Sequence, residues 1–275
     1  MLYEERLDLT LPPGWYIFAP EWGRILEARN FLPILGSFLA FKLFSICMWR
    51  WSWTNFSGFR QYRLRNLTIC ITHSMISGGF VLGFAITHFR LMFDNPATYY
   101  EPYMKYVFQF SVGYFIHDAL DMLKHEISRW TLELLFHHAV TVFVFLCPIC
   151  SHDFAIFGYW GLLMEVNSVF LHMRTLHQLS GRAESHKMEF EIIKYLNVVT
   201  FVIFRFFVQI FQVHFTFTQQ DHFVYFYKAV GLYGSIFFFV VNCMLLYRVL
   251  ASDGFLGKKI QTAAKNSNRD KEKDK

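Results

Sequence analysis

Residues 132–150 read LELLFHHAVTVFVFLCPIC, an apolar run whose polar side chains include Glu133, His137 and His138. A helix of about 19 residues rises about 28 Å, close to the thickness of a bilayer's hydrocarbon core. Similar apolar runs lie on both sides of this stretch, and the alternating ten-residue segments of a membrane β-barrel are absent. The sequence therefore predicts an all-α polytopic membrane protein with about seven transmembrane helices. The other six runs cover residues 31–49, 67–89, 105–123, 154–172, 195–217 and 223–247.

The composition excludes several other classes of protein. Of the 275 residues, 54% are hydrophobic, 20% aromatic and 17% charged, whereas soluble domains usually carry about 25% charged residues. The five cysteines are scattered and most lie in apolar runs, which excludes a secreted disulfide scaffold. The net charge of +5 is concentrated in the C-terminal tail and forms no basic domain face. No nucleic-acid partner is therefore expected.

Basic residues indicate the orientation in the membrane. Most of the 26 Lys and Arg residues fall in the connections after the first, third and fifth runs and in the tail. By the positive-inside rule, the N-terminus is outside and the C-terminus is cytosolic. Residues 1–30 then form an extracytosolic segment, and residues 256–275 form a disordered basic cytosolic tail.

Two interpretations of the tail remain open. It is either a solvated segment that sets topology or an electrostatic contact with anionic inner-leaflet lipids. Lys271 and Lys273 also have the spacing of a dilysine retrieval signal for the endoplasmic reticulum, which is a weak match in a tail this rich in lysine.

Ionisable residues inside the predicted spans mark the candidate site, because a charged group in hydrocarbon is costly. His117, Asp118 and Asp121 lie near the cytosolic end of the third run, and His137 and His138 lie near that end of the fourth. A short predicted cytosolic loop joins the two runs. We therefore expect these groups to meet at matched depth inside the bundle.

Three further ionisable residues lie on the other runs. His73 is on the second run, Glu165 on the fifth and Arg205 on the sixth. A buried arginine is expected to have an acidic partner or a lipid phosphate. The candidate acidic partners of Arg205 are Glu165, Asp118 and Asp121.

Three roles for the grouped histidines and carboxylates remain open. They can pair to fix helix packing, they can perform acid–base chemistry such as acyl transfer, or they can bind a metal. Desaturase-type iron sites need several spaced histidine clusters, and this chain has one histidine pair. We therefore predict no metal and no bound cofactor.

An ordered set of sequence patches resembles the TRAM-Lag-CLN (TLC) domain family. Within that family, the likeness is closest to TLC domain-containing proteins linked to membrane fluidity and phospholipid acyl composition. The resemblance implies a six-helix TLC domain over residues 60–255 around a lipid-sized cavity, with residues 31–49 as an additional N-terminal helix. The patches are Arg65-Asn66 through His73-Ser74, the GYFIHD segment at 113–118, Glu133 with His137-His138, Glu165-Val166, Lys194-Tyr195 with Asn197, and Phe204-Arg205.

The resemblance also implies a function. In the ceramide synthases of the wider family, the histidine pair matching His137 and His138 takes part in N-acyl transfer from acyl-CoA. Those enzymes carry a downstream acidic motif of which this chain keeps one acid, Glu165. The fluidity branch also lacks that motif. Resemblance to this branch implies a regulator that limits incorporation of polyunsaturated acyl chains into phospholipids and keeps membranes rigid. The expected location is the plasma membrane, with the endoplasmic reticulum as the alternative.

Two functional hypotheses follow, with a transporter or channel as a more distant third because internal duplication and paired broken helices are not visible. In the first, a non-enzymatic protein handles membrane phospholipids or acyl chains. In the second, an acyltransferase uses acyl-CoA as substrate, with His137 or His138 as general base and Asp118 orienting the imidazolium. The lipid-binding candidates are His73, His117, Asp121, Glu165 and Arg205. His137, His138 and Asp118, the catalytic candidates of the second hypothesis, are expected to lie at the same lipid site.

Overall fold

The computed structural model describes residues 17, 19–125, 129–219 and 223–262. Most of the predicted extracytosolic segment at residues 1–30 and of the predicted tail at residues 256–275 therefore lies outside the described residues.

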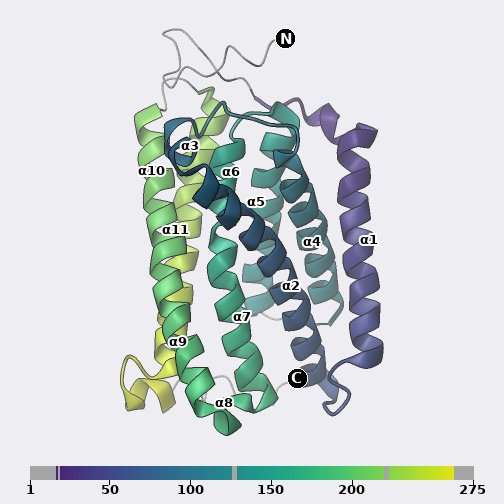
Figure 1. The fold of residues 1–275 in the computed structure, drawn as a ribbon, viewed down its shortest axis with the longest axis vertical. Coiled ribbons are helices and arrows are strands. Elements are labelled where there is room, and N and C mark those ends of the chain that lie inside the picture. The colour runs from purple at the N-terminus through teal and green to yellow at the C-terminus, as the bar shows by residue number, and fades with distance from the viewer. Residues whose placement is uncertain (1–16, 18, 126–128, 220–222, 263–275) are drawn as a thin grey trace.

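Helices account for nearly all regular structure in the described ranges, and the long ones lie side by side in one bundle (Figure 1). Helix α6 continues into α7 through Leu163, and α9, η3 and α10 follow one another without a break. The long helices are α1 (Ala28–Trp51), α2 (Gly58–Thr87), α4 (Met104–His125), α5 (Arg129–Ser151), α7 (Met164–Ser180), α9 (Lys187–Phe201), α10 (Val208–Gln219) and α11 (Tyr225–Asp253). The shorter elements are η2 (Trp22–Leu26), α3 (Phe89–Asp94), α6 (Ala155–Leu162), α8 (Arg182–Ser185) and the π-helical segment η3 (Val202–Phe207).

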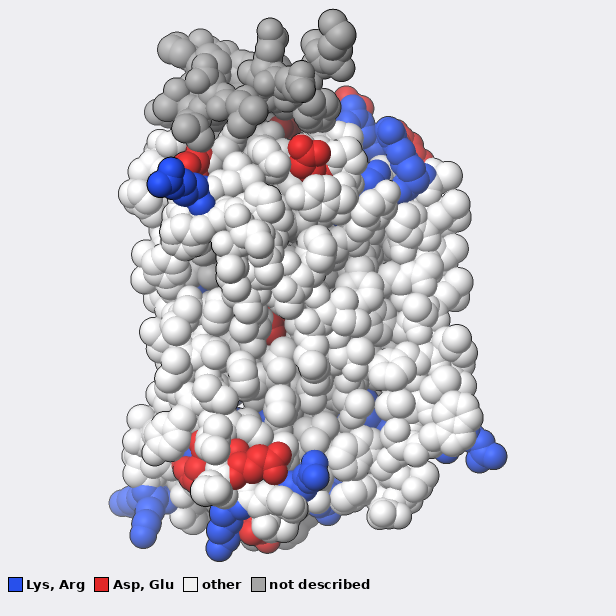
Figure 2. Space-filling view, viewed as in Figure 1, with Lys and Arg blue, Asp and Glu red and all other residues white. Residues whose placement is uncertain are grey.

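The helices confirm the predicted polytopic all-α fold. Within the described residues, five helical stretches are long and apolar enough to cross a membrane. In Figure 2, Lys, Arg, Asp and Glu side chains gather at the two ends of the molecule, and the band between them is almost free of charge. The five stretches are Ala28–Trp51, Gly58–Thr87, Thr131–Ser151, Lys187–Gln219 and Tyr225–Asp253.

The predicted count of seven spans is not confirmed, and the sequence of the two remaining candidates explains why. Helix α4 packs between α1 and α5, but its buried face carries polar groups such as Gln109, His117 and Asp118. The rod made of α6 and α7 is interrupted at Leu163, so each part is short. Both elements lie within the bundle (Figure 1). Several of their polar side chains are buried, among them Gln109 and Asp118 of α4 and Asn167 and Ser168 of α7.

Small residues let neighbouring helices approach closely. A Cβ atom added at Gly113 on α4 would lie 2.6 Å from the Ser37 Cβ and 2.7 Å from the Ile34 carbonyl oxygen, both on α1. The Ser37 hydroxyl donates a hydrogen bond to the Phe110 carbonyl at 2.7 Å. Gly78 on α2 has a similar close contact with the backbone of Val166 on α7, at 3.0 Å. These contacts fix α1 against α4 and α2 against α7.

Candidate functional site

His138 joins three helices through buried hydrogen bonds. Its Nε2 atom lies 3.1 Å from the Asp118 Oδ2 atom on α4. The other carboxylate oxygen of Asp118 accepts a 2.6 Å hydrogen bond from the Asn66 amide on α2. The predicted meeting of imidazole and carboxylate between the third and fourth runs is thus present in the structure.

The hydrogen-bond partners of His138 limit its capacity to act as a general base. Its Nδ1 atom lies 2.6 Å from the Leu134 carbonyl oxygen, which can only accept a hydrogen bond, so Nδ1 carries a proton. Its Nε2 atom faces Asp118. Both ring nitrogens are therefore engaged with oxygen atoms. The arrangement accounts for helix pairing and leaves no His138 nitrogen free to take a proton from a substrate.

His73 and Glu165 form a second polar contact between α2 and α7. The His73 Nδ1 atom lies 3.8 Å from the Glu165 Oε2 atom, and the Ser74 hydroxyl donates to the same oxygen at 2.5 Å. The His73 ring stacks on Tyr114 with 3.8 Å between ring centroids, and its Nε2 atom pairs with the Ser111 hydroxyl at 3.1 Å. His73 is therefore held in place on every side by neighbouring groups.

Arg205 lies on the π-helical segment η3 and is bound by neutral oxygens. A π-helical turn often occurs at functional sites, because it changes the direction in which side chains project. The guanidinium of Arg205 donates to Asn167 Oδ1 at 2.6 Å, Ser168 Oγ at 2.9 Å and Asn242 Oδ1 at 3.0 Å. The expected acidic partner, Glu165, lines the same cavity and interacts electrostatically with Arg205, but no direct salt bridge joins the two side chains. Glu165 accepts a hydrogen bond from the Ser74 hydroxyl, and amide and hydroxyl oxygens accept the hydrogen bonds of the Arg205 guanidinium.

A cavity of about 150 Å³ lies between α5, α6, α7, η3, α10 and α11. Its wall on α5 extends from His137 to Pro148, about 16 Å along the helix axis. The polar groups His137, Glu165, Ser168 and Arg205 are among the residues that line it. Aromatic rings line it over much of its length, namely Phe115, Phe145, Phe154, Phe157, Phe215, Phe223, Tyr227 and Phe238.

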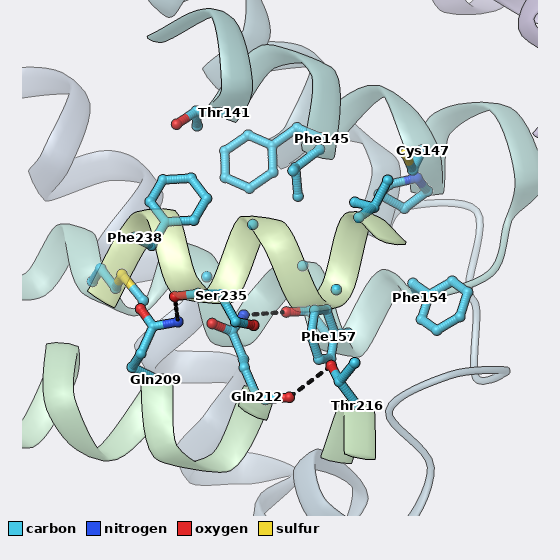
Figure 3. Close-up of a pocket in the computed structure, with 18 of the residues that line it drawn as sticks. Thr141, Phe145, Cys147, Phe154, Phe157, Gln209, Gln212, Thr216, Ser235 and Phe238 are labelled. Carbon is cyan, nitrogen blue, oxygen red and sulfur yellow. Dashed lines mark hydrogen bonds between the residues drawn. The ribbon is translucent and has the colours of Figure 1, made fainter. Parts of the chain in front are cut away.

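Figure 3 shows how the helices share this cavity. Thr141 and Phe145 of α5 lie on one side, and Gln209 and Gln212 lie on the opposite side. The two glutamine side chains donate to carbonyl oxygens, Gln209 to Ser235 at 3.2 Å and Gln212 to Phe157 at 3.4 Å (Figure 3). One amide hydrogen of each glutamine is thus engaged, and together with the aromatic lining this gives a mainly apolar channel with a polar end at His137 and Arg205.

The predicted site residues lie in three places: in the cavity lining, in polar contacts between helices, and away from the cavity. His137, Glu165 and Arg205 line the cavity. His73, Asp118 and His138 lie in the polar contacts between helices described above.

His117 and Asp121 instead lie apart from the cavity lining. The His117 ring packs against Phe38 and Phe41 of α1, at centroid distances of 6.1 and 6.4 Å, and both its nitrogens are buried without a hydrogen-bond partner among the described residues. The backbone carbonyl of Asp121 pairs with His125 Nδ1 at 2.9 Å. Neither residue is placed where it would touch a molecule in the cavity.

The sequence reasoning did not single out Ser168 or Asn242, two of the partners of Arg205, or the aromatic wall. Asn242 is an isolated polar residue in the apolar sequence of α11, and such a residue is a usable signal for an interhelical hydrogen bond. The aromatic wall gives no such signal, since 34 phenylalanines are spread over the whole chain. Within the described residues, no three His, Cys, Asp or Glu side chains are grouped so that they could hold a metal ion.

The fold and the cavity define a multi-pass membrane protein with an amphipathic internal site. Residues 63–251 match the TLC domain, TRAM_LAG1_CLN8, and the chain belongs to the TLC domain family. This confirms the family indicated by the sequence patches.

Several proteins of this family are similar to the chain over much of its length. TLC domain-containing protein 2 of Danio rerio is 27% identical over 213 residues, which cover 78% of this chain and 85% of that protein. TLC domain-containing protein 1 of Gallus gallus is 30% identical over 204 residues, with 71% and 76% covered. TLC domain-containing protein 2 of Mus musculus is 29% identical over 189 residues, with 67% and 56% covered. No solved structure gives a significant match.

Proposed function

We propose that this protein regulates the phospholipid composition and fluidity of the plasma membrane. In this proposal it limits the incorporation of polyunsaturated acyl chains into phospholipids and so promotes membrane rigidity. Membership of the TLC domain family supports a lipid-related function in a membrane. The observation that carries the proposal is the cavity with an apolar channel and a polar end.

The shape and chemistry of the cavity suit one acyl chain. Its lining is elongated along α5 and α11, and aromatic side chains contribute much of it. Apolar surfaces of this kind bind hydrocarbon by excluding water or other lipids. At the polar end, Arg205 and His137 provide N–H groups for the carbonyl or carboxyl oxygens of a lipid. The protein thus has the means to hold an acyl chain without any bound cofactor.

Lipid analysis of cells tests this function. Cells lacking the protein are expected to contain more polyunsaturated chains in their phospholipids and to have more fluid plasma membranes, and the wild-type chain should reverse both changes. The measurements are mass spectrometry of phospholipid species and the emission spectrum of a polarity-sensitive membrane dye. An unchanged acyl composition after deletion would contradict the proposal.

The proposed topology places the N-terminus outside and the C-terminus in the cytosol of the plasma membrane. The basic tail then faces anionic inner-leaflet lipids, which attract clustered lysines. Epitope tags at each end, stained before and after permeabilisation, test the orientation. Stain confined to the endoplasmic reticulum would favour the alternative compartment.

An acyltransferase is the second candidate function, and one observation favours it. The His137 side chain lines the cavity, and its buried Nδ1 atom has no hydrogen-bond partner among the described residues. An imidazole with an unengaged nitrogen beside a lipid site is suited to general base catalysis. His137 fits this role better than His138, whose nitrogens both face oxygens. Purified protein incubated with labelled acyl-CoA and lipid acceptors should then form an acylated product that His137→Gln abolishes.

A further inference from the structure

The side of the cavity between α5 and α11 differs from its other sides. Around the cavity, α5 packs on α6, α6 on α7 and α10, and α10 on α11. Helices α5 and α11 instead meet through aromatic side chains. Phe136 contacts Phe237 with 5.1 Å between ring centroids, and His137 contacts Phe238 at 5.4 Å. Both contacts are edge-to-face.

These two contacts form consecutive layers between the cavity and the outside of the bundle. His137 and Phe238 belong to the cavity lining. Phe136 is 57% exposed and lies on the outer surface of the predicted span. Neighbouring outward residues of α11, Tyr233 and Ile236, are also well exposed, so this outer surface faces the bilayer. Two pairs of rings therefore separate membrane lipid from the cavity.

Next to the ring pairs, α11 offers little side-chain bulk toward the cavity. Gly234 lines the cavity, and a Cβ atom added there would meet no atom within 4 Å. Gly231 lies one turn away and packs against Thr216 of α10, at 2.7 Å for an added Cβ atom. The bare backbone at Gly234 leaves free space immediately beside the inner pair, His137 and Phe238. Figure 3 shows the Phe238 ring on the side of α11 that faces Thr141 and Phe145.

We call the line of contact between α5 and α11 the seam. Contacts at both of its ends hold these two helices together. At the predicted cytosolic end, Arg248 of α11 donates to Glu133 of α5 at 3.0 Å. At the other end, Phe143 of α5 contacts Phe226 of α11, and Trp22 stacks on Phe143 at 5.4 Å. Ring rotations between these ends can open the seam while the helices stay in place, because aromatic side chains turn about two bonds.

We propose that the seam between α5 and α11 is a lateral entrance through which an acyl chain passes between the bilayer and the cavity, with Phe136–Phe237 and His137–Phe238 as its gate. This inference rests on the proposed function, since it requires an acyl chain to occupy the cavity. The apolar seam admits hydrocarbon directly from the membrane, so the chain need not cross water.

Exchange kinetics of a photoreactive fatty acid test the gate. Vesicles containing a fatty acid with a terminal diazirine are mixed with the full-length protein in phosphatidylcholine nanodiscs. Flash photolysis at increasing times, followed by mass spectrometry of the α10 and α11 peptides that line the cavity, gives the rate and extent of loading. A chase with unlabelled fatty acid gives the rate of release.

Removing the ring of Phe136 or Phe237 should change the rates at which the fatty acid loads and leaves, without changing its affinity for the cavity. Phe136 and Phe237 do not line the cavity, so Phe136→Ala and Phe237→Ala are each expected to raise loading and release rates together, by about three- to tenfold. The final extent of labelling should stay the same. Phe80→Ala is the matched control, because Phe80 is a similarly exposed ring on α2, away from the seam, and it should change neither rate.

The outcomes separate the two proposals. Unchanged rates in both seam variants, with normal labelling of the cavity, would overturn the gate and leave the proposed function standing. A wild-type protein whose cavity peptides are never labelled would overturn the proposed function itself.

Discussion

The His138 imidazole on α5 lies 3.1 Å from the Asp118 carboxylate on α4, while the preceding residue, His137, lines the cavity. Adjacent residues on a helix point about 100° apart, so the two members of a histidine pair necessarily face different surroundings. One joins helices and the other meets whatever occupies the cavity. Substitutions at the two histidines should therefore have separable effects.

Asp118→Asn and His138→Gln should each destabilise the protein. Removing one partner of a buried ion pair leaves the other charge without compensation, at a cost of about 3–5 kcal/mol. The two changes together should cost less than the sum of the single changes. Thermal unfolding in detergent micelles measures this difference.

The exposed pair of Glu133 and Arg248 provides the control for this experiment. Both side chains are more than 40% exposed, so Glu133→Gln should cost at most about 1 kcal/mol. Strictly additive effects of Asp118→Asn and His138→Gln would contradict a direct interaction between these residues.

His137→Gln should leave the unfolding temperature nearly unchanged and weaken the effect on phospholipid composition. The substitution keeps a polar side chain of similar size but removes the imidazole from the polar end of the cavity. The test is rescue of acyl composition in cells that lack the protein. His214→Gln makes the same chemical change on the exposed surface of α10 and should rescue fully. Equal rescue by both variants would argue against a role for His137 at the site.

Much of the fold follows from the sequence because burial in a membrane leaves a strong pattern. The apolar runs locate the helices, since a span must be long, helical and mostly uncharged. Matched depth along two joined helices also places His138 near Asp118. The sequence pattern does not show which way each polar residue faces around its helix relative to helices far along the chain. His117 and Asp121 share a stripe, and that stripe packs away from the cavity.

The partners of Arg205 show a second limit. A buried guanidinium is expected to lie beside a carboxylate, but three neutral oxygens from α7 and α11 accept hydrogen bonds from three of the five N–H groups of Arg205. Choosing between these solutions requires the relative rotation of three helices. That rotation is set by packing, such as the close approach of Gly78 to α7, and leaves no local sequence signature.

Gly113→Ala should loosen α1 from the rest of the bundle. The new methyl group would lie 2.6 Å from the Ser37 Cβ and 2.7 Å from the Ile34 carbonyl oxygen, so the helices must separate. Overpacking of this kind typically costs about 1–3 kcal/mol. Thermal unfolding, together with protease cleavage in the 52–57 connection between α1 and α2, measures the effect.

A second substitution distinguishes the backbone contact from the side-chain contact at Gly113. Ser37→Gly removes the Cβ atom of Ser37 but leaves the Ile34 carbonyl in place. The double variant should therefore remain less stable than Ser37→Gly alone. Equal stability of the two would show that α1 does not approach α4 as closely as the structure indicates.

Gly234→Leu should block the cavity while preserving the fold. Gly234 lines the cavity and an added Cβ atom meets nothing within 4 Å, so a leucine side chain can extend into space that an acyl chain would occupy. Stability should be maintained or slightly raised, because Leu favours helix over Gly by roughly 1 kcal/mol and filling a cavity adds contacts. Labelling of the cavity by the photoreactive fatty acid, and rescue of phospholipid composition, should both fall. Gly36→Leu is the matched control, since Gly36 is also free of neighbours within 4 Å but lies on the exposed face of α1. Normal labelling and full rescue by Gly234→Leu would mean that lipid acts elsewhere on the protein.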